Sequence, residues 1–267
     1  MFKRITLGAA NLIERRFLQN EIIAERYQII SHLGSGSYGN SYLVLDRVSQ
    51  QQKVLKALRI HKRIKKSGKK GFKLEINILK SLKHPQFPKF YEDGTYKRIP
   101  FYTMEYIEGK NFEQLIFQDG QQYTETEAFG IAYELLKLIH YLHEHHLIHR
   151  DIRIPNVIMS GSKIFLIDLG LTRKCDQEND KKPKRNLRKE ANRQADFYGL
   201  GHFLLFLLYS SYSFPQDQKE SSWEEELDIS YQAKHIINRL LQIEAGYDSC
   251  EQVKSDIKKI IGEIGRK

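Results

Sequence analysis

The sequence predicts an α+β fold with two lobes, the first rich in β-strands and the second mainly helical. Residues 27–106 hold apolar runs on both sides of a glycine-rich turn and one stretch with helical spacing. A short hinge follows, and in residues 107–267 apolar positions recur at helical spacing. A chain of 267 residues is long enough to bury a two-lobed core.

Residues 1–26 are expected to form a basic, amphipathic N-terminal extension. Its apolar residues stand at roughly helical spacing, and they are Leu12, Ile13, Phe17, Ile22 and Ile23. We expect this face to pack against the first lobe. Peripheral membrane contact is the alternative, because basic residues flank the face, namely Lys3, Arg4, Arg15 and Arg16.

Composition favours a cytoplasmic protein. Two cysteines, Cys175 and Cys250, do not make a disulfide framework, so a reducing compartment is expected. The longest apolar block, residues 203–209, is too short to span a bilayer, which predicts that the chain has no transmembrane segment. The first ten residues are too weakly apolar for a signal peptide.

A glycine-rich turn, residues 33–39, opens the first lobe. Gly34, Gly36 and Gly39 let the backbone approach phosphate oxygens closely and point N–H groups at them. This spacing also opens dinucleotide-binding folds, but there a helix follows the glycines. Here an apolar, strand-like run follows, residues 42–45. The turn therefore predicts a phosphate-binding loop between two strands.

A lysine and a glutamate follow this turn at informative positions. Lys56 ends the apolar run Val54-Leu55-Lys56, where its ammonium group is placed to reach phosphates. Glu75 lies in a stretch whose apolar residues share one helical face, namely Phe72, Ile76 and Leu79. We expect Glu75 to pair with Lys56.

The first long helix of the second lobe is expected to begin at Thr124. Glu127 stands three positions later, which is the spacing of a capping box. The helix leads to residues 149–156, where the carboxylate of Asp151 lies five positions before the amide of Asn156. A second carboxylate, Asp168, follows the apolar run 164–167. Phosphoryl transfer needs such a set, because one group orients the attacking hydroxyl and oxygen ligands hold Mg²⁺ against the phosphates.

In the order and spacing of these motifs the chain resembles the eukaryotic-like protein kinase family, in its small, single-domain bacterial serine/threonine type. The resemblance extends from about Tyr27 to about Ile264. It implies the two-lobed protein kinase-like fold, with a β-rich N-lobe that holds one regulatory helix and a mainly helical C-lobe. It also implies that Asp196 begins the buried helix that anchors the catalytic loop.

The resemblance implies a serine/threonine protein kinase that uses ATP with Mg²⁺, or with Mn²⁺ in its place, acts on protein substrates and can autophosphorylate. Asp151 would orient the substrate hydroxyl, Asn156 and Asp168 would hold the metal, and Lys56, fixed by Glu75, would hold the α- and β-phosphates. The nucleotide would also contact Leu33, Gly34, Gly36, Gly39, Val54, Met104 (as gatekeeper), the backbone of Glu105 and Ile107, and Ile158. His149, Leu169 and Leu79 would form the apolar column of the family.

Several residues depart from the family pattern. Ser41 stands where a valine usually covers the adenine, and Arg153 replaces the usual catalytic-loop lysine while keeping its charge. Tyrosine kinases generally place arginine two residues further on, where this chain has Pro155. The pattern therefore favours Ser and Thr as acceptors.

The segment between Asp168 and Asp196 is short, and Thr172 is its only hydroxyl residue. We expect activity without phosphorylation of this segment, with Asp176, Glu178 or Asp180 supplying a standing negative charge near Arg150. The family's conserved ion pair is expected in charge-swapped form, between Lys184 and Asp248.

Positive charge is concentrated in two runs, although the formal net charge is only +10. Residues 59–70 and residues 181–193 are the densest, and the first is expected to connect a strand to the Glu75 helix. One interpretation is an ordinary solvated face. The other is an anionic regulator, either DNA or an acidic lipid surface, or else an acidic protein substrate.

Two other functions remain open at this point. The first is a catalytically weak nucleotide-binding scaffold, a pseudokinase. The second is a small-molecule or sugar kinase of related fold, because such enzymes also diverge after the metal motif. They usually have glycine where this chain has Arg150, so the intact His149-Arg150-Asp151 favours protein substrates.

Overall fold

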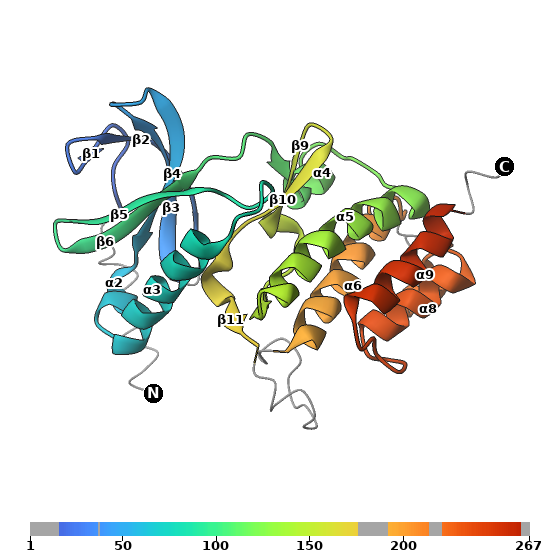
Figure 1. Cartoon of the computed structure of the whole chain (residues 1–267). Helices are drawn as coiled ribbons and strands as arrows, with labels where there is room; N and C mark the ends of the chain where they lie inside the picture. The colour runs from blue at the N-terminus through green and yellow to red at the C-terminus, as the bar shows by residue number, and fades with distance from the viewer. Residues whose placement is uncertain (1–15, 37, 176–191, 214–220, 263–267) are drawn as a thin grey trace, which may run out of the picture. The chain divides into compact units, whose positions relative to one another are not determined.

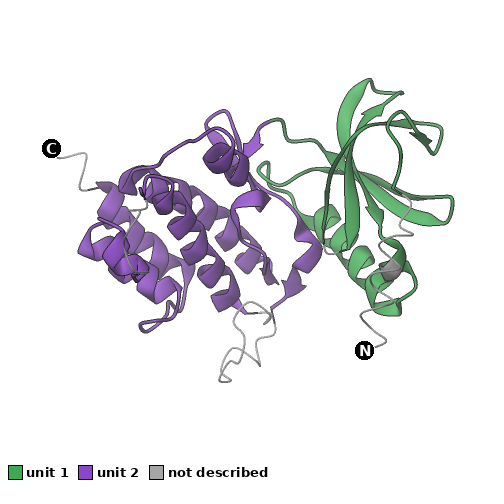
Figure 2. Ribbon diagram, turned by 180° about the vertical axis from the view of Figure 1, so that it is seen from behind, with its two compact units in different colours: residues 1–108 green, residues 109–267 purple. Residues whose placement is uncertain are grey.

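A computed structural model describes residues 16–36, 38–175, 192–213 and 221–262. The chain divides into two compact units, residues 1–108 and 109–267, coloured separately in Figure 2. The boundary falls two residues after the position expected from the sequence, residue 106.

The first unit is built on an antiparallel sheet (Figure 1). Its strands are β1 (Ile22–Ile23), β2 (Tyr27–Ser35), β3 (Gly39–Asp46), β4 (Gln51–Leu58), β5 (Phe90–Tyr96) and β6 (Ile99–Glu105), in the spatial order β1-β2-β3-β4-β6-β5. The short helix α2 (Ile60–Arg63) and the longer α3 (Lys66–Ser81) connect β4 to β5. Residues 59–70 were expected to connect a strand to this helix, and they form α2 and the first turns of α3.

Alternating side chains explain why the sheet buries one face. In β3, Tyr42 and Val44 are buried, and they join Ile29 and Leu55 from the neighbouring strands in one apolar cluster. Helix α3 buries the face predicted from its spacing, which consists of Phe72, Ile76 and Leu79.

The described part of the N-terminal extension corrects one expectation. Residues 16–26 form turns and strand β1, so the helical spacing of the sequence was misleading. Ala24 and Glu25 have positive φ angles, which a helix does not allow, and Ile23 pairs with Tyr27. The expected packing is confirmed for Phe17, which is 7 % exposed and belongs to the core cluster of the sheet. Leu12 and Ile13 lie outside the described residues.

A buried ion cluster stabilises the turn between β3 and β4. Asp46 is fully buried and accepts hydrogen bonds from Arg26 Nε and Nη2, both at 2.8 Å, and from Lys53 Nζ at 2.6 Å. Ser49 and the Val48 N–H donate to the same carboxylate. These donors, Arg26 first, hold the pKa of Asp46 far below its ordinary range.

The second unit is mainly helical (Figure 1). Its helices are α4 (Phe112–Phe117), α5 (Glu125–Glu144), α6 (Arg193–Tyr209), α7 (Trp223–Glu226), α8 (Tyr231–Leu240) and α9 (Cys250–Gly262). Two small sheets accompany them: β7 (Lys110–Asn111), β9 (Val157–Ser160) and β10 (Lys163–Leu166) in one, and β8 (Leu147–Ile148) and β11 (Arg173–Lys174) in the other.

The predicted capping box at Thr124 is confirmed. The Thr124 side chain accepts from the Glu127 N–H, and the Glu127 carboxylate accepts from the Thr124 N–H at 2.9 Å. Among the described residues, no helix combines the length and the apolar character that a membrane crossing requires.

Candidate active site

Lys56 and Glu75 form a buried ion pair in the first unit. Lys56 lies on β4 and Glu75 on α3, and Lys56 Nζ is 2.6 Å from Glu75 Oε1. The side chains are 3 % and 1 % exposed. The Tyr102 hydroxyl donates to the same Glu75 oxygen at 2.9 Å. The predicted pair is therefore present, and an additional tyrosine, which the sequence analysis missed, holds its carboxylate.

The glycine-rich turn connects β2 to β3. Gly36 N–H donates to the Gly39 carbonyl at 2.9 Å, which closes the turn. A Cβ atom at Gly39 would lie 2.9 Å from Lys56 Cγ, so glycine is needed for the lysine stem to pass beneath the strand. At Gly34 a Cβ atom would meet no protein atom within 4 Å, so space is open beside the backbone there. Leu33, which precedes it, is 48 % exposed.

The residues expected to contact adenine follow on β4 and β6. Val54 pairs with Met104 across these strands and is 8 % exposed. Glu105 N–H donates to the Lys89 carbonyl at 2.8 Å, so of the Glu105 and Ile107 amides only that of Ile107 is left to donate to a ligand. Ser41, also expected near the adenine, pairs with Lys56 in the sheet.

In the second unit, Asp151 is held by two neighbours. Asn156 Nδ2 donates to Asp151 Oδ2 and to the Asp151 carbonyl, both at 2.9 Å. Arg153 Nε lies 3.1 Å from Asp151 Oδ1. Because the side-chain nitrogen of Asn156 is used in this way, its side-chain oxygen, Oδ1, is the atom that it offers to a cation.

Asp168 follows strand β10, and hydrogen bonds of the preceding residue, Ile167, fix its position. Ile167 N–H donates to the Asn156 carbonyl at 2.9 Å, and His149 Nε2 hydrogen-bonds the Ile167 carbonyl at 3.2 Å. Asp168 has φ 60°, a left-handed conformation that is rare outside glycine, and its Oδ1 accepts from the Gly170 N–H at 3.1 Å. The second unit therefore brings Asp151, Asn156 and Asp168 together through one short hydrogen-bonded segment. Ile158 follows Asn156 by two residues and lies on β9.

Asp196, at the start of α6, fixes the backbone before Asp151. Its Oδ2 accepts from His149 N–H at 2.9 Å, and its Oδ1 accepts from Arg150 N–H at 2.7 Å. His143 Nε2 also hydrogen-bonds Oδ2 at 2.9 Å, and Asp196 is fully buried. The predicted anchoring of the catalytic loop by this aspartate is confirmed.

Cys250 extends this group to α9. Its Sγ lies 3.5 Å from His143 Nδ1. Burial is the main cause that raises the pKa of the Cys250 thiol, to about 12. The thiol therefore stays protonated and donates to the histidine, so the cysteine, histidine and aspartate form a structural chain, not a nucleophilic triad.

The donor set fits a magnesium ion shared with phosphates. Mg²⁺ binds through one or two protein oxygen ligands together with phosphate oxygens and water. Asn156 and Asp168 offer an amide oxygen and a carboxylate, and the part of the chain described here holds no cluster of three or more His, Cys, Asp or Glu side chains suited to a metal. Asn156 and Asp168 are the side chains of this group that could hold such a metal.

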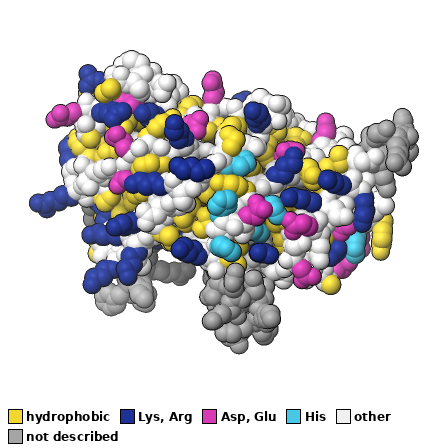
Figure 3. All heavy atoms as spheres, viewed as in Figure 1, with side chains coloured by type: hydrophobic (Ala, Val, Ile, Leu, Met, Phe, Trp, Pro, Cys, Tyr) yellow, Lys and Arg dark blue, Asp and Glu magenta, His cyan; other side chains and the backbone are white. Residues whose placement is uncertain are grey.

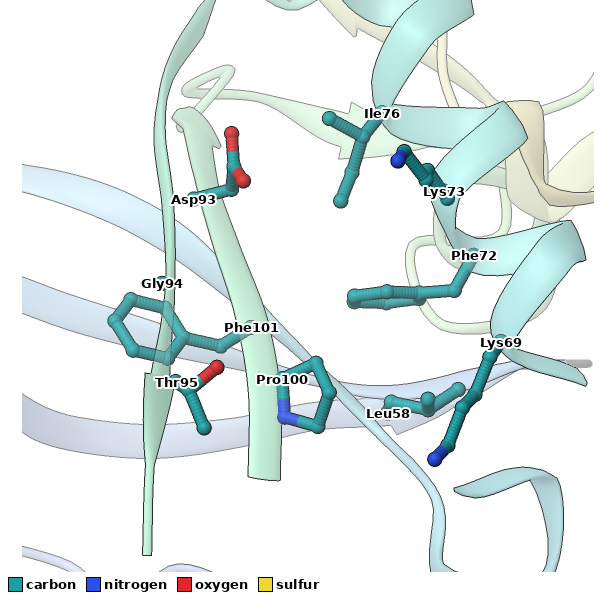
Figure 4. Close-up of a pocket in the computed structure, with 10 residues that line it drawn as sticks. All are labelled: Leu58, Lys69, Phe72, Lys73, Ile76, Asp93, Gly94, Thr95, Pro100 and Phe101. Atoms are coloured by element: carbon teal, nitrogen blue, oxygen red, sulfur yellow. The ribbon is translucent and has the colours of Figure 1, made fainter. Parts of the chain in front are cut away.

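A small cavity in the first unit lies apart from these groups. It has a volume of about 250 Å³ and lies between α3 and strands β5 and β6 (Figure 4). Phe72 and Ile76 point into it from the helix, and Lys69 and Lys73 stand on the same side. None of the residues expected to bind nucleotide lines it.

Sequence comparison identifies the family. A sequence model of the protein kinase domain matches residues 27–267. The chain belongs to the protein kinase family. The match covers the first unit from residue 27 onward and all of the second, and it includes every residue to which the resemblance assigned a role.

Individual kinases are similar along most of the chain. A probable serine/threonine-protein kinase, YbdM of Bacillus subtilis (strain 168), is 36 % identical over 95 % of this chain and 96 % of its own length. An Aurora kinase of Eremothecium gossypii is 27 % identical over 86 % of this chain and 67 % of its own. The crystal structure of the Mycobacterium tuberculosis PknI kinase domain has a TM-score of 0.69 at 18 % identity, over 92 % of this chain and all of that one. The predicted family and kinase fold are thus confirmed.

The segment after the metal motif is described only in part. Thr172 is fully buried and its backbone N–H donates to the Leu169 carbonyl at 3.0 Å. Asp176, Glu178, Asp180 and Lys184 lie outside the described residues, and so does most of the run 181–193. The expected Lys184–Asp248 pair remains a prediction.

Proposed function

We propose that this protein kinase transfers the γ-phosphate of ATP to Ser and Thr hydroxyls of protein substrates, including its own chain. The observation that carries the proposal is that both oxygens of the Asp151 carboxylate are held in place. Asn156 contacts Oδ2 and Arg153 contacts Oδ1. The buried Lys56–Glu75 pair supports it from the other unit. The serine/threonine kinases similar in sequence, YbdM above all, support the same reaction.

Each residue has one task in this reaction. Lys56 contacts the α- and β-phosphates, and Glu75 with Tyr102 keeps its ammonium group in place. Asp151 orients the acceptor hydroxyl, whose oxygen forms a bond to the γ-phosphorus while the bond to the ADP oxygen breaks, and it accepts the hydroxyl proton. Asn156 and Asp168 hold the metal, which offsets the negative charge of the phosphates.

The nucleotide contacts follow from the same proposal. Gly34, Gly36 and Gly39 approach the phosphates, with Leu33 beside them. Val54 and Ile158 pack against the adenine ring, and Met104 limits the depth of the site. The Ile107 N–H and a backbone group of Glu105 bind the edge of the ring.

An anionic regulator is the second part of the proposal. Lys and Arg side chains gather over α2 and α3 (Figure 3), and the first turn of α3 contains no acidic residue. Lys65 and Lys66 are exposed and form no ion pair with a described residue. DNA or an acidic lipid surface would bind here, at residues 59–70, and at residues 181–193, and so act on the helix that carries Glu75. Peripheral membrane association of a cytoplasmic enzyme would use the N-terminal extension, residues 1–26, where basic residues flank the apolar positions.

One experiment tests both parts. Purified protein is incubated with Mg²⁺-ATP and a basic acceptor protein, with and without duplex DNA or phosphatidylserine vesicles, and phosphate is located by mass spectrometry. The proposal predicts phosphoserine or phosphothreonine that is absent with Asp151→Asn. It also predicts an anion effect that Lys65→Glu/Lys66→Glu removes and that the exposed control Lys163→Glu keeps. Tight ATP binding without transfer to protein contradicts the proposed reaction, and activity unchanged by either anion contradicts the regulator.

A further inference from the structure

Tyr38, in the glycine-rich turn, lies on the surface of helix α3. A Cβ atom built at Gly71 of that helix would be 2.5 Å from Tyr38 Cε1 and 2.8 Å from Cζ. No side chain larger than hydrogen fits between this position and the ring. The absence of a side chain at Gly71 therefore lets the Tyr38 ring pack directly against the helix backbone.

Two further contacts hold Tyr38 in place. Lys62 Nζ, on helix α2, is 5.0 Å from the centroid of the Tyr38 ring, within the range of a cation–π interaction. Arg59 N–H donates to the Tyr38 carbonyl at 3.1 Å. Both of these contacts come from the segment that connects β4 to α3, and the ring itself lies against α3.

The helix carries two glycines at this surface, and each has a packing reason. Glycine is the least favourable residue in a helix interior except proline, so its presence calls for one. A Cβ atom at Gly68 would be 2.3 Å from the Lys62 carbonyl oxygen, which shows that α2 packs closely there. Gly71, one turn further on, has Tyr38 as its neighbour. Both α2 and the glycine-rich turn therefore pack against the first half of α3, at Gly68 and Gly71 respectively.

The contact lies next to the buried ion pair. Gly71 precedes Glu75 by four residues, so both lie on one face of α3. Gly39, which follows Tyr38, lies against the stem of Lys56. Two consecutive residues of the turn therefore touch the helix that carries Glu75 and the lysine that pairs with it.

We propose that Tyr38 and Gly71 form a latch that couples the glycine-rich turn to helix α3, so that nucleotide binding at the turn and Lys56–Glu75 pairing favour each other. The coupling is reciprocal, because a ligand that favours the latched state also favours the helix position in that state. Both residues are positioning residues, and the proposal rests on the proposed function in that the ligand is Mg²⁺-nucleotide.

The decisive variant is Gly71→Ala. The added methyl group meets the far end of a tyrosine side chain, which can swing away, so the helix keeps its fold while the latch opens. We expect affinity for Mg²⁺ with a non-hydrolysable ATP analogue, measured by calorimetry, to fall by about 5- to 20-fold, in the usual range of such coupling. Tyr38→Ala removes the ring and should give a similar fall.

Two comparisons separate a latch from a general structural effect. The double variant Tyr38→Ala/Gly71→Ala should bind no more weakly than either single variant, because each removes the same contact. Gly130→Ala, in α5, is the matched control, because a Cβ atom there meets nothing within 4 Å. The Gly130→Ala variant should bind the nucleotide with wild-type affinity.

Hydrogen exchange tests the latch without nucleotide. The Arg59 amide, which donates to the Tyr38 carbonyl, should exchange about 10-fold faster in Gly71→Ala and in Tyr38→Ala than in wild type or Gly130→Ala. Wild-type affinity and exchange in Gly71→Ala, or additive losses in the double variant, would overturn the proposal. Failure of wild type to bind nucleotide would refute the proposed function instead, and the exchange comparison would still decide whether the latch exists.

Discussion

Replacing Asp196 by asparagine should destabilise the second unit severely. The carboxylate is fully buried and accepts three hydrogen bonds, from His143 Nε2, His149 N–H and Arg150 N–H. Asparagine has one acceptor oxygen, and its NH₂ group would face at least one of these donors. Each hydrogen bond to a buried charged group contributes about 1.5–3 kcal/mol, and a broken buried ionic contact costs about 3–5 kcal/mol. We therefore expect the free energy of unfolding to fall by about 3–5 kcal/mol.

The assay uses the single tryptophan of the chain, Trp223, which lies on α7 of the second unit. With a urea dependence of about 2 kcal/mol per molar, the fluorescence midpoint of Asp196→Asn should fall by roughly 1.5–2.5 M. Asp228→Asn removes a charge at an exposed position and should move the midpoint by less than about 0.25 M. A shift below about 0.5 M for Asp196→Asn would show that these hydrogen bonds do not hold the loop.

Three further predictions concern other buried groups. Glu75→Gln removes the negative charge that pairs with the Lys56 ammonium, so phosphate transfer should fall by about 10- to 150-fold in steady-state assays; an unchanged rate would contradict this role. Asp46→Asn should lower the free energy of unfolding by about 3–5 kcal/mol at neutral pH. Because the folded-state pKa of Asp46 is lowered, this difference should be full above about pH 4 and shrink as the pH falls further; urea titrations that show the same gap at pH 3 would contradict it. Burial and the raised pKa of Cys250 should keep its thiol unalkylated by iodoacetamide at pH 8 in folded protein, while the half-buried Cys175 reacts; two adducts by intact mass would contradict this.

Residues whose chemistry is local could be placed from the sequence. The capping box at Thr124 depends on two residues that stand three positions apart, and the buried face of α3 depends on one helical period. The Lys56–Glu75 pair is not local, but it follows from the order of the motifs that the kinase family shares.

Tyr102 and Cys250 were not predicted, because their contacts join residues that lie far apart in the sequence. Tyr102 lies 27 positions after Glu75, and in the sequence it is an ordinary aromatic residue of a buried strand. Cys250 meets His143 across 107 positions. The N-terminal extension was wrongly predicted to be helical for a related reason. Ile22 and Ile23 fit a helical period, but in the structure their backbone pairs with β2 instead.

The role of Asp151 is tested most simply by comparing nucleotide affinity with phosphate transfer in Asp151→Asn. Asp151 is assigned to the acceptor hydroxyl, whereas Lys56, Asn156 and Asp168 are assigned to the nucleotide and its metal. We predict that this variant binds Mg²⁺-ATP within about twofold of wild type and transfers phosphate at least 100-fold more slowly, as expected for loss of a group that acts in the transition state. Transfer that persists at the wild-type rate would show that Asp151 does not act on the acceptor hydroxyl.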